Sequence, residues 1–332
     1  MINNISTFFI FGFILLPVSL ITGPAIPDLT ITFGGLFFLI YILLSKKLNL
    51  LTANNLWIIS ILFWVYILII TFTAENKYLS FRDAFIFIRL LFLPILIIYI
   101  SSIEEKFLEK IVFIIFVCVL FVTLDTFFQY TQYDAEFGFG KDIFGFKTDW
   151  YGRLTGPFGD ELIPGAYLSK FAFLGLVYLF IKIRNTLHLN IISTLYLSFI
   201  GITIFASAER MALATYLMGL GFLFLFYKNK RKIFFNSIVL TILLSFAAYK
   251  LHPIYNDYKV IESTPYHLGL KIEKNFNCKN DVNKKCNKII LLQPEFQKII
   301  KNFDQSAYGE IYNLGLKIFK DHKFFGAGLN NF

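Results

Sequence analysis

Long apolar runs alternate with short polar connections through the first 249 residues of the chain. A membrane-spanning helix needs about 20 mostly apolar residues to cross roughly 30 Å of hydrocarbon. Since backbone groups in lipid must find partners within their own segment, each run is predicted to be helical. The predicted spans are residues 6–22, 29–44, 55–73, 81–100, 108–128, 163–183, 189–206, 211–227 and 233–249. The pattern therefore predicts an all-α, polytopic transmembrane helix bundle.

The first run has neither the basic segment nor the small-x-small cleavage site of a signal peptide, so it is interpreted as a retained span. Basic residues gather in the connections after even-numbered spans, at Lys46, Lys47, Lys106, Lys110, Lys182, Arg184, Lys228, Lys230, Arg231 and Lys232. By the positive-inside rule, the N-terminus is expected in the cytoplasm. The long connections 129–162 and 250–332 are then expected in the periplasm.

The composition agrees with a membrane location, because 57% of the residues are hydrophobic and only 16% are charged. A soluble domain usually has about 25% charged residues. The net charge of +9 does not indicate nucleic-acid binding. The positive charge lies in short connections and one long hydrophilic loop, not on a basic helix with interleaved aromatic residues.

The predicted domain organisation is a bundle over residues 1–249, with an external loop at 129–162, followed by a large periplasmic loop over 250–332. This last loop does not return to the membrane, so a truncated sequence is expected. Apolar positions at helical spacing predict helices at 288–302 and 310–322. Gly326 and Gly328 would follow the end of the second helix.

The cysteines and histidines show no metal-binding pattern, and no cofactor is expected. Cys118 lies in the fifth span and is interpreted as a packing residue. Cys278 and Cys286 lie in the same external loop, where an oxidising compartment would allow a disulfide. Two free thiols are the alternative, and the sequence leaves both open.

Charged residues within spans are costly and therefore informative. Arg82 and Arg89 in the fourth span are seven residues apart, which puts them on one helix face about 10 Å apart. They either form an anion-facing stripe or serve structure, with Arg89 bonded to a carboxylate or to carbonyl groups of a neighbouring helix.

Two connections contain residues suited to a phosphate. Arg210 ends the short join after the seventh span and begins a helix, whose N-terminus favours anions. Arginine adds a bidentate donor, although an arginine bonded to lipid headgroups is the alternative. The loop 129–162 is rich in Gly and contains Arg153, Asp160 and Glu161 near the membrane surface. That set suits phosphate binding with proton transfer, or else a loop closed by salt bridges.

Several segments resemble elements of the O-antigen ligase and O-antigen polymerase superfamily, in their order and in their position relative to the spans. They are Arg153-Leu-Thr-Gly-Pro-Phe158, Ala206-Ser-Ala-Glu-Arg210, the stretch from Gly315 to Phe332 with its Gly-x-Gly element, and the opening Ile21-Thr-Gly-Pro-Ala-Ile-Pro-Asp28. The resemblance implies an all-helical membrane glycosyltransferase of about ten to twelve spans. It implies a glycan donor on undecaprenyl pyrophosphate, an acceptor that is lipid A–core or a growing glycan, and no metal.

By the same resemblance, Arg153 and Arg210 match the arginines that hold the pyrophosphate. The catalytic histidine of the superfamily lies further along, beyond Phe332, and His322 precedes the Gly-x-Gly element and is not assigned this role. The catalytic residue is therefore unknown, with Asp160 and Glu161 as weak candidates. The alternatives are a polymerase of the same fold, a transporter or flippase for a lipid-linked anion, and a non-catalytic scaffold. Pro94 is the only break well inside a span, which argues against a transporter.

Overall fold

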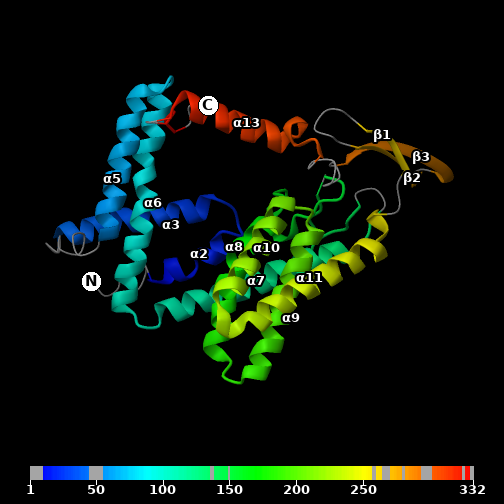
Figure 1. Ribbon diagram of the computed structural model, residues 1–332, viewed down its shortest axis with the longest axis horizontal. Coiled ribbons are helices and arrows are strands. Elements are labelled where there is room, and N and C mark those ends of the chain that lie inside the picture. Colours follow the sequence, from blue (N-terminus) through cyan, green and yellow to red (C-terminus); the bar gives the residue numbers. More distant parts are fainter. Residues whose placement is uncertain are drawn as a thin grey trace. The chain divides into compact units, whose positions relative to one another are not determined.

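The computed structural model describes residues 10–44, 55–134, 138–148, 150–255, 259–263, 270–278, 281–292, 301–323 and 326–329 (Figure 1). The chain divides into two compact units. Unit 1 comprises residues 1–108 and 296–332, and unit 2 comprises residues 109–295.

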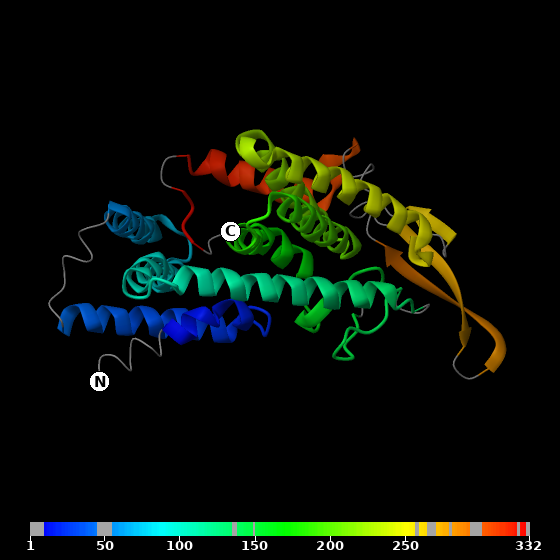
Figure 2. The ribbon, with the colours of Figure 1, turned by 90° about the horizontal axis from the view of Figure 1, so that it is seen from below.

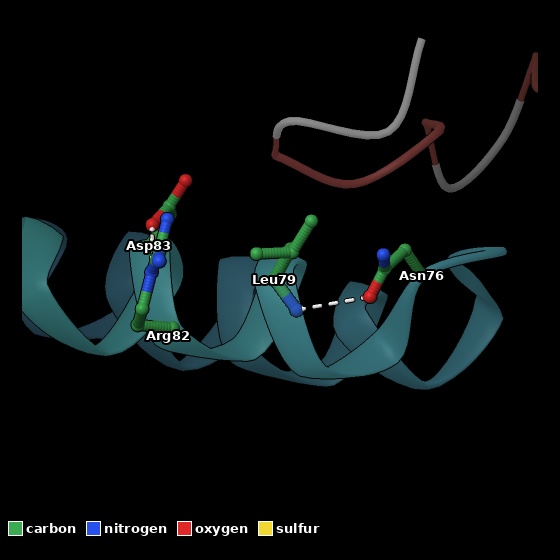
Figure 3. A network of polar contacts seen from close by, with 4 residues as sticks. All are labelled: Asn76, Leu79, Arg82 and Asp83. Atoms are coloured by element: carbon green, nitrogen blue, oxygen red, sulfur yellow. Dashed lines mark hydrogen bonds and ion pairs between the residues drawn. The ribbon is translucent and has the colours of Figure 1, made fainter.

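Unit 1 contains the first apolar helices and the last helix of the chain. Its elements are α2 (Leu16–Ser19), α3 (Ala25–Leu44), α5 (Asn55–Ile70), the 3-10 turn η1 (Thr71–Thr73), α6 (Lys77–Ile103), η6 (Phe303–Gln305) and α13 (Ala307–Asp321). The start of α6 is fixed by Asn76, whose side-chain oxygen accepts a hydrogen bond from the Leu79 backbone N–H at 3.2 Å (Figure 3). This is the usual N-cap arrangement, which satisfies a backbone donor that has no partner within the helix.

Unit 2 contains the helices around the loop that carries Arg153, and a small sheet. Its elements are α7 (Phe107–Thr131), η2 (Gly156–Phe158), α8 (Pro164–Lys182), α9 (Thr186–Ala206), α10 (Arg210–Phe226), η3 (Lys228–Lys230), α11 (Arg231–Leu251), η4 (Pro253–Tyr255) and the strands β1 (Lys259–Ser263), β2 (Leu270–Cys278) and β3 (Asp281–Leu292). Helix α9 packs against α8, α10 and α11.

Small residues let the unit 2 helices approach closely. A Cβ added to Gly201 in α9 would lie 2.5 Å from the Thr241 Oγ1 in α11. The Tyr216 hydroxyl is buried between helices and donates to the Leu197 carbonyl at 2.6 Å. Small residues at contacts and satisfied polar groups are what helix association in lipid requires, because burial of apolar surface brings no advantage there.

Six described helices are long and apolar enough to cross a membrane: Ala25–Leu44, Lys77–Ser102, Phe107–Thr131, Pro164–Lys182, Thr186–Ala206 and Lys228–Leu251. Two shorter apolar helices, Trp57–Thr73 and Arg210–Phe226, coincide with the third and eighth predicted spans. The predicted all-α polytopic bundle is therefore confirmed, and the chain is a multi-pass membrane protein.

The first predicted span is wrong as a single helix. Residues 10–14 are helical, Leu15 interrupts them, and α2 follows with Pro17 in its first turn; residues 6–9 lie outside the described part of the chain. A proline inside a helix removes a backbone donor and its ring meets the preceding turn, whereas it is tolerated at a helix start. The first helix therefore stops before Leu15, and a new one begins at Leu16 with Pro17 in its first turn.

The three strands form an antiparallel sheet in the order β1-β2-β3, with β2 and β3 as a long hairpin (Figure 2). The prediction of a helix over 288–302 is wrong for residues 288–292, which belong to β3; residues 293–300 lie outside the described part. In β3, Ile289 and Ile290 are β-branched and fit a strand better than a helix. The prediction of a helix over 310–322 is confirmed by α13, which Ser306 caps by accepting from the Gly309 N–H at 3.1 Å.

The register of the hairpin pairs Cys286 with Phe276, and Cys278 with Asp281. The side chains of these residues lie outside the described part of the structure, so the Cys278–Cys286 disulfide stays a prediction. Cys118 is a buried free cysteine in α7, as the sequence predicts.

Candidate functional site

The loop segment that begins at Arg153 is held against α7 by Gln129, a buried polar residue near the end of that helix. The Gln129 Oε1 accepts hydrogen bonds from the backbone N–H groups of Thr155 at 3.1 Å and Gly156 at 2.9 Å. The Gln129 amide nitrogen also lies 3.4 Å from the Thr155 Oγ1. One side chain therefore satisfies two backbone donors of the loop and fixes the path on which Arg153 lies.

Gly156 explains why the motif Arg-x-x-Gly-x-Phe contains a glycine. Its φ of +51° is in the left-handed region, and an added Cβ would collide with the Oγ1 of Thr126 in α7. Only glycine allows the backbone to turn this way in such close contact with a helix. The turn leads into η2 and then to α8, which begins at Pro164 with a residue suited to a helix start.

Glu209 joins the beginning of α8 to the turn between α9 and α10. Its Oε1 accepts from the Gly165 N–H at 2.6 Å, and its Oε2 accepts from the Ala166 N–H at 2.9 Å. A Cβ on Gly165 would lie 2.9 Å from the Glu209 Oε1, so the carboxylate is seated directly on the helix backbone. A carboxylate is stabilised at a helix N-terminus by the free N–H groups and the helix dipole.

The electrostatic surroundings of Glu209 connect it to Arg153. Burial raises the pKa of the Glu209 carboxyl, while the hydrogen bonds from Gly165 and Ala166 and the charge of Arg153 act against that rise. The charge of Arg153 therefore acts on Glu209, a residue of the Ser207–Arg210 turn that the sequence prediction did not select.

The turn carries Arg210 to the start of α10. Ala208 has a φ of +61°, which is uncommon for a residue other than glycine and tightens the join between α9 and α10. Glu209 is the N-cap residue of α10, yet its side chain makes no capping bond to α10, because it is committed to α8. The first N–H groups of α10 thus have no capping partner from Glu209, and Arg210 lies beside them.

The other predicted site residues occupy different positions. Asp160 and Glu161 are exposed and follow η2 in the loop before α8. Arg82 and Arg89 belong to unit 1. Arg82 pairs with its neighbour Asp83 at 2.9 Å on the surface of α6 (Figure 3).

Arg89 bonds the Asp28 carboxylate of α3 at 2.9 Å and lies 3.4 Å from the Thr32 hydroxyl. This contact is the structural pair that the sequence left as one of two interpretations. It explains how α6 carries an arginine in an apolar helix, because the charge is compensated within the bundle. A role of Arg82 and Arg89 in substrate binding stays a prediction.

His252 is a second polar contact that the sequence prediction did not include. Its Nε2 lies 2.9 Å from the Tyr130 carbonyl oxygen at the end of α7, and its Nδ1 accepts from the Ile254 N–H at 3.2 Å. The ring packs against the Tyr130 and Phe139 rings, with centroids 4.4 and 5.4 Å apart. Burial lowers the pKa of His252. Since Nδ1 accepts from Ile254, the proton belongs on Nε2, which donates to the Tyr130 carbonyl and so joins the end of α11 to the end of α7.

An apolar cavity of about 530 Å³ lies among the helices of unit 2. Its lining comes from α7, α8, α9 and α11, with Phe116, Leu120, Leu179, Tyr196, Phe199 and Leu244 among the residues that contribute. Phe199 lies in α9, seven residues before Ala206 and the turn that carries Glu209, which is about 10 Å along the helix.

These observations define a multi-pass helical membrane protein with polar residues gathered at the starts of α8 and α10 and an apolar cavity among the helices of the same unit. Residues 195–332, which include the Glu209 turn, match the family model described as O-antigen ligase. The resemblance predicted from the sequence is thereby confirmed for this part of the chain. No curated protein and no solved structure matches the chain.

Proposed function

We propose that the protein transfers a glycan from undecaprenyl pyrophosphate to an acceptor, in the manner of an O-antigen ligase. The proposal is supported above all by one observation: the charge of Arg153 acts on the buried Glu209, which directly precedes Arg210 at the start of α10, within a chain whose residues 195–332 match the O-antigen ligase family model. Polymerisation of O-antigen units would use the same chemistry with a different acceptor.

The donor leaves as a pyrophosphate, whose negative charge grows as the glycosidic bond breaks. Guanidinium groups and helix N–H groups at a partly buried site stabilise such a charge more strongly than they would in bulk water. We assign this role to Arg153, to Arg210 and to the first N–H groups of α10. Glu209 supports this assignment, because its bonds to the start of α8 hold the turn that precedes Arg210.

The polyprenyl tail needs an apolar surface close to the site. The cavity between α7, α8, α9 and α11 offers one, because its lining is almost wholly apolar and reaches α9 about two turns before the Glu209 turn. In this proposal the enzyme lies in the bacterial inner membrane with the site on its periplasmic side. Asp160 and Glu161 are the candidates in the described loop for the base that takes the proton of the acceptor hydroxyl.

The test is transfer of a radiolabelled lipid-linked glycan in membranes that contain the protein, with lipid A–core or a second lipid-linked glycan as acceptor. Arg153→Lys and Arg210→Lys are each expected to lower the rate by at least about tenfold, because lysine lacks the bidentate fork of arginine. Arg184→Lys is the matched control, since Arg184 is an exposed arginine between α8 and α9. It should transfer at the unaltered rate.

Unchanged rates in both Arg153→Lys and Arg210→Lys would contradict the assignment of these residues to the pyrophosphate. Absence of transfer by the unaltered protein, with movement of the intact lipid-linked glycan across vesicles, would instead establish a transporter. The acceptor that receives the label distinguishes a ligase from a polymerase.

A further inference from the structure

The last helix of the described chain, α13, has two chemically different sides. At 3.6 residues per turn, its apolar residues cover an arc of roughly 200°, which includes Ile311, Leu314 and Phe319. The opposite side carries Glu310, Asn313, Lys317 and Lys320. A helix with this division lays its apolar side against another apolar surface.

That apolar side is exposed in the structure. The exposed fractions are 67% for Ile311, 53% for Leu314 and 65% for Phe319. In both overall views, α13 runs away from α5 and α6, which belong to the same unit, rather than along either of them (Figures 1 and 2). A contiguous row of exposed apolar side chains on a helix of four turns marks an interaction surface.

The segment after α13 packs closely against the turn between α5 and α6. A Cβ added to Gly328 would lie 2.9 Å from the Ser80 Oγ and 3.2 Å from the Ala74 Cβ. Gly326 and Gly328 both have left-handed φ values, of +73° and +88°, so the Gly-x-Gly element is shaped to fit this place. Both helices that meet at this turn are apolar, and the turn therefore marks a membrane boundary.

Chain length keeps α13 close to this boundary. Asp321, the last residue of α13, is five residues before Gly326, and five residues span at most about 18 Å. The helix has 15 residues and carries two acidic and two basic side chains, so it is too short and too charged to cross the bilayer. An amphipathic helix held at this level has the lipid surface as its nearest apolar partner.

We propose that α13 lies in the plane of the membrane interface, with Ile311, Leu314 and Phe319 inserted among the lipid chains. Lys317, Lys320 and Lys323 then lie at headgroup level near the C-terminal end of the helix, where they complement anionic phospholipids. The proposal concerns the position of α13 and is independent of the transfer reaction. It also gives the Gly-x-Gly element a role, since that element ties the helix to the α5–α6 turn.

Spin labels along α13 test the proposal in the full chain, reconstituted into vesicles of phosphatidylethanolamine and phosphatidylglycerol. The native cysteines are first replaced (Cys118→Ala, Cys278→Ser, Cys286→Ser), and the background is accepted if its circular dichroism and gel filtration match the original chain. Leu314→Cys and Phe319→Cys then carry labels on the apolar side. Asn313→Cys and Lys317→Cys, one and two residues before these positions but on the polar side, are the matched controls.

Labels at 314 and 319 are expected to collide with oxygen, which dissolves in lipid, several-fold more often than with a water-soluble nickel chelate. Labels at 313 and 317 should show the reverse preference. Equal exposure of all four labels to the nickel chelate would overturn the proposal, because α13 would then lie in water. Spin–spin broadening at 314 and 319 would overturn it in favour of a second copy, and immobile labels without oxygen contact would do so in favour of a protein surface.

Discussion

Removing the Gln129 side-chain amide is expected to release the loop on which Arg153 lies. In Gln129→Leu the apolar side chain has a similar size, but the N–H groups of Thr155 and Gly156 lose their acceptor. A buried donor left without a partner costs about 1–3 kcal/mol, so two such donors cost roughly 2–6 kcal/mol if the loop keeps its place. The loop avoids this cost by moving toward water.

Hydrogen exchange at the Thr155 and Gly156 amides measures this release directly. Each 1.4 kcal/mol of lost protection is a factor of ten, so exchange should accelerate by at least about tenfold in Gln129→Leu. Gln132→Leu is the matched control, because Gln132 is exposed and lies three residues further along the chain. Its exchange at the same two amides should equal that of the unaltered protein.

Transfer activity provides the second measurement on the same variants. Under the proposed function, Gln129→Leu should lose transfer along with the protection of the loop, because Arg153 is then no longer held beside Glu209. Unchanged protection in Gln129→Leu would refute the account of how the loop is held. Lost protection with unchanged transfer would refute the claim that this loop path positions Arg153.

Two further predictions concern the same unit. Gly156→Ala should prevent normal folding, because the added Cβ would collide with Thr126. Adding Thr126→Ala should recover most of the thermal stability and leave only the cost of the left-handed backbone at residue 156, about 1–2 kcal/mol. A double variant as unstable as Gly156→Ala alone would show that the collision is not the cause. Burial lowers the pKa of His252 in the folded protein, so as the pH falls the unfolded chain binds a proton at this residue before the folded one does. The melting temperature should therefore fall as the pH drops below about 6.5, the usual histidine pKa. An equally steep fall in His252→Gln would show that His252 is not the cause.

The apolar runs predict most of the helices, because crossing a bilayer imposes a length and a composition that few other structures share. The first apolar run has the required length and composition, yet it does not form a single helix, because a new helix begins at Leu16 with Pro17 in its first turn. The effect of one proline is not visible in the average composition of the run. The run Lys288–Leu292 is too short for its period to separate a helix from a strand, and its pairing with β2 decides the outcome.

The site is predictable only in part. Arginines near predicted span ends point to Arg153 and Arg210 because charge at a membrane boundary is conspicuous in the sequence. Glu209 and Gln129 are not conspicuous, since their partners lie 44 and 26 residues away along the chain. Nothing in a single sequence indicates which backbone N–H groups such a side chain will reach. Gly156 and Gly165 are the sequence features that could have pointed to these contacts, because glycine is required where the backbone closely approaches another element.

The bond between His252 and the Tyr130 carbonyl also has a consequence for how the chain is threaded. It requires the end of α7 and the end of α11 to emerge on one face of the bilayer, and the bonds of Glu209 require the same of the α9–α10 turn and the start of α8. The chain must therefore cross the membrane an even number of times between the end of α7 and the end of α11. Helix α10 has only 17 residues, about 26 Å, yet it must pass fully from one face to the other. If it dipped in and came back, His252 would end roughly 30 Å from its partner, across the hydrocarbon.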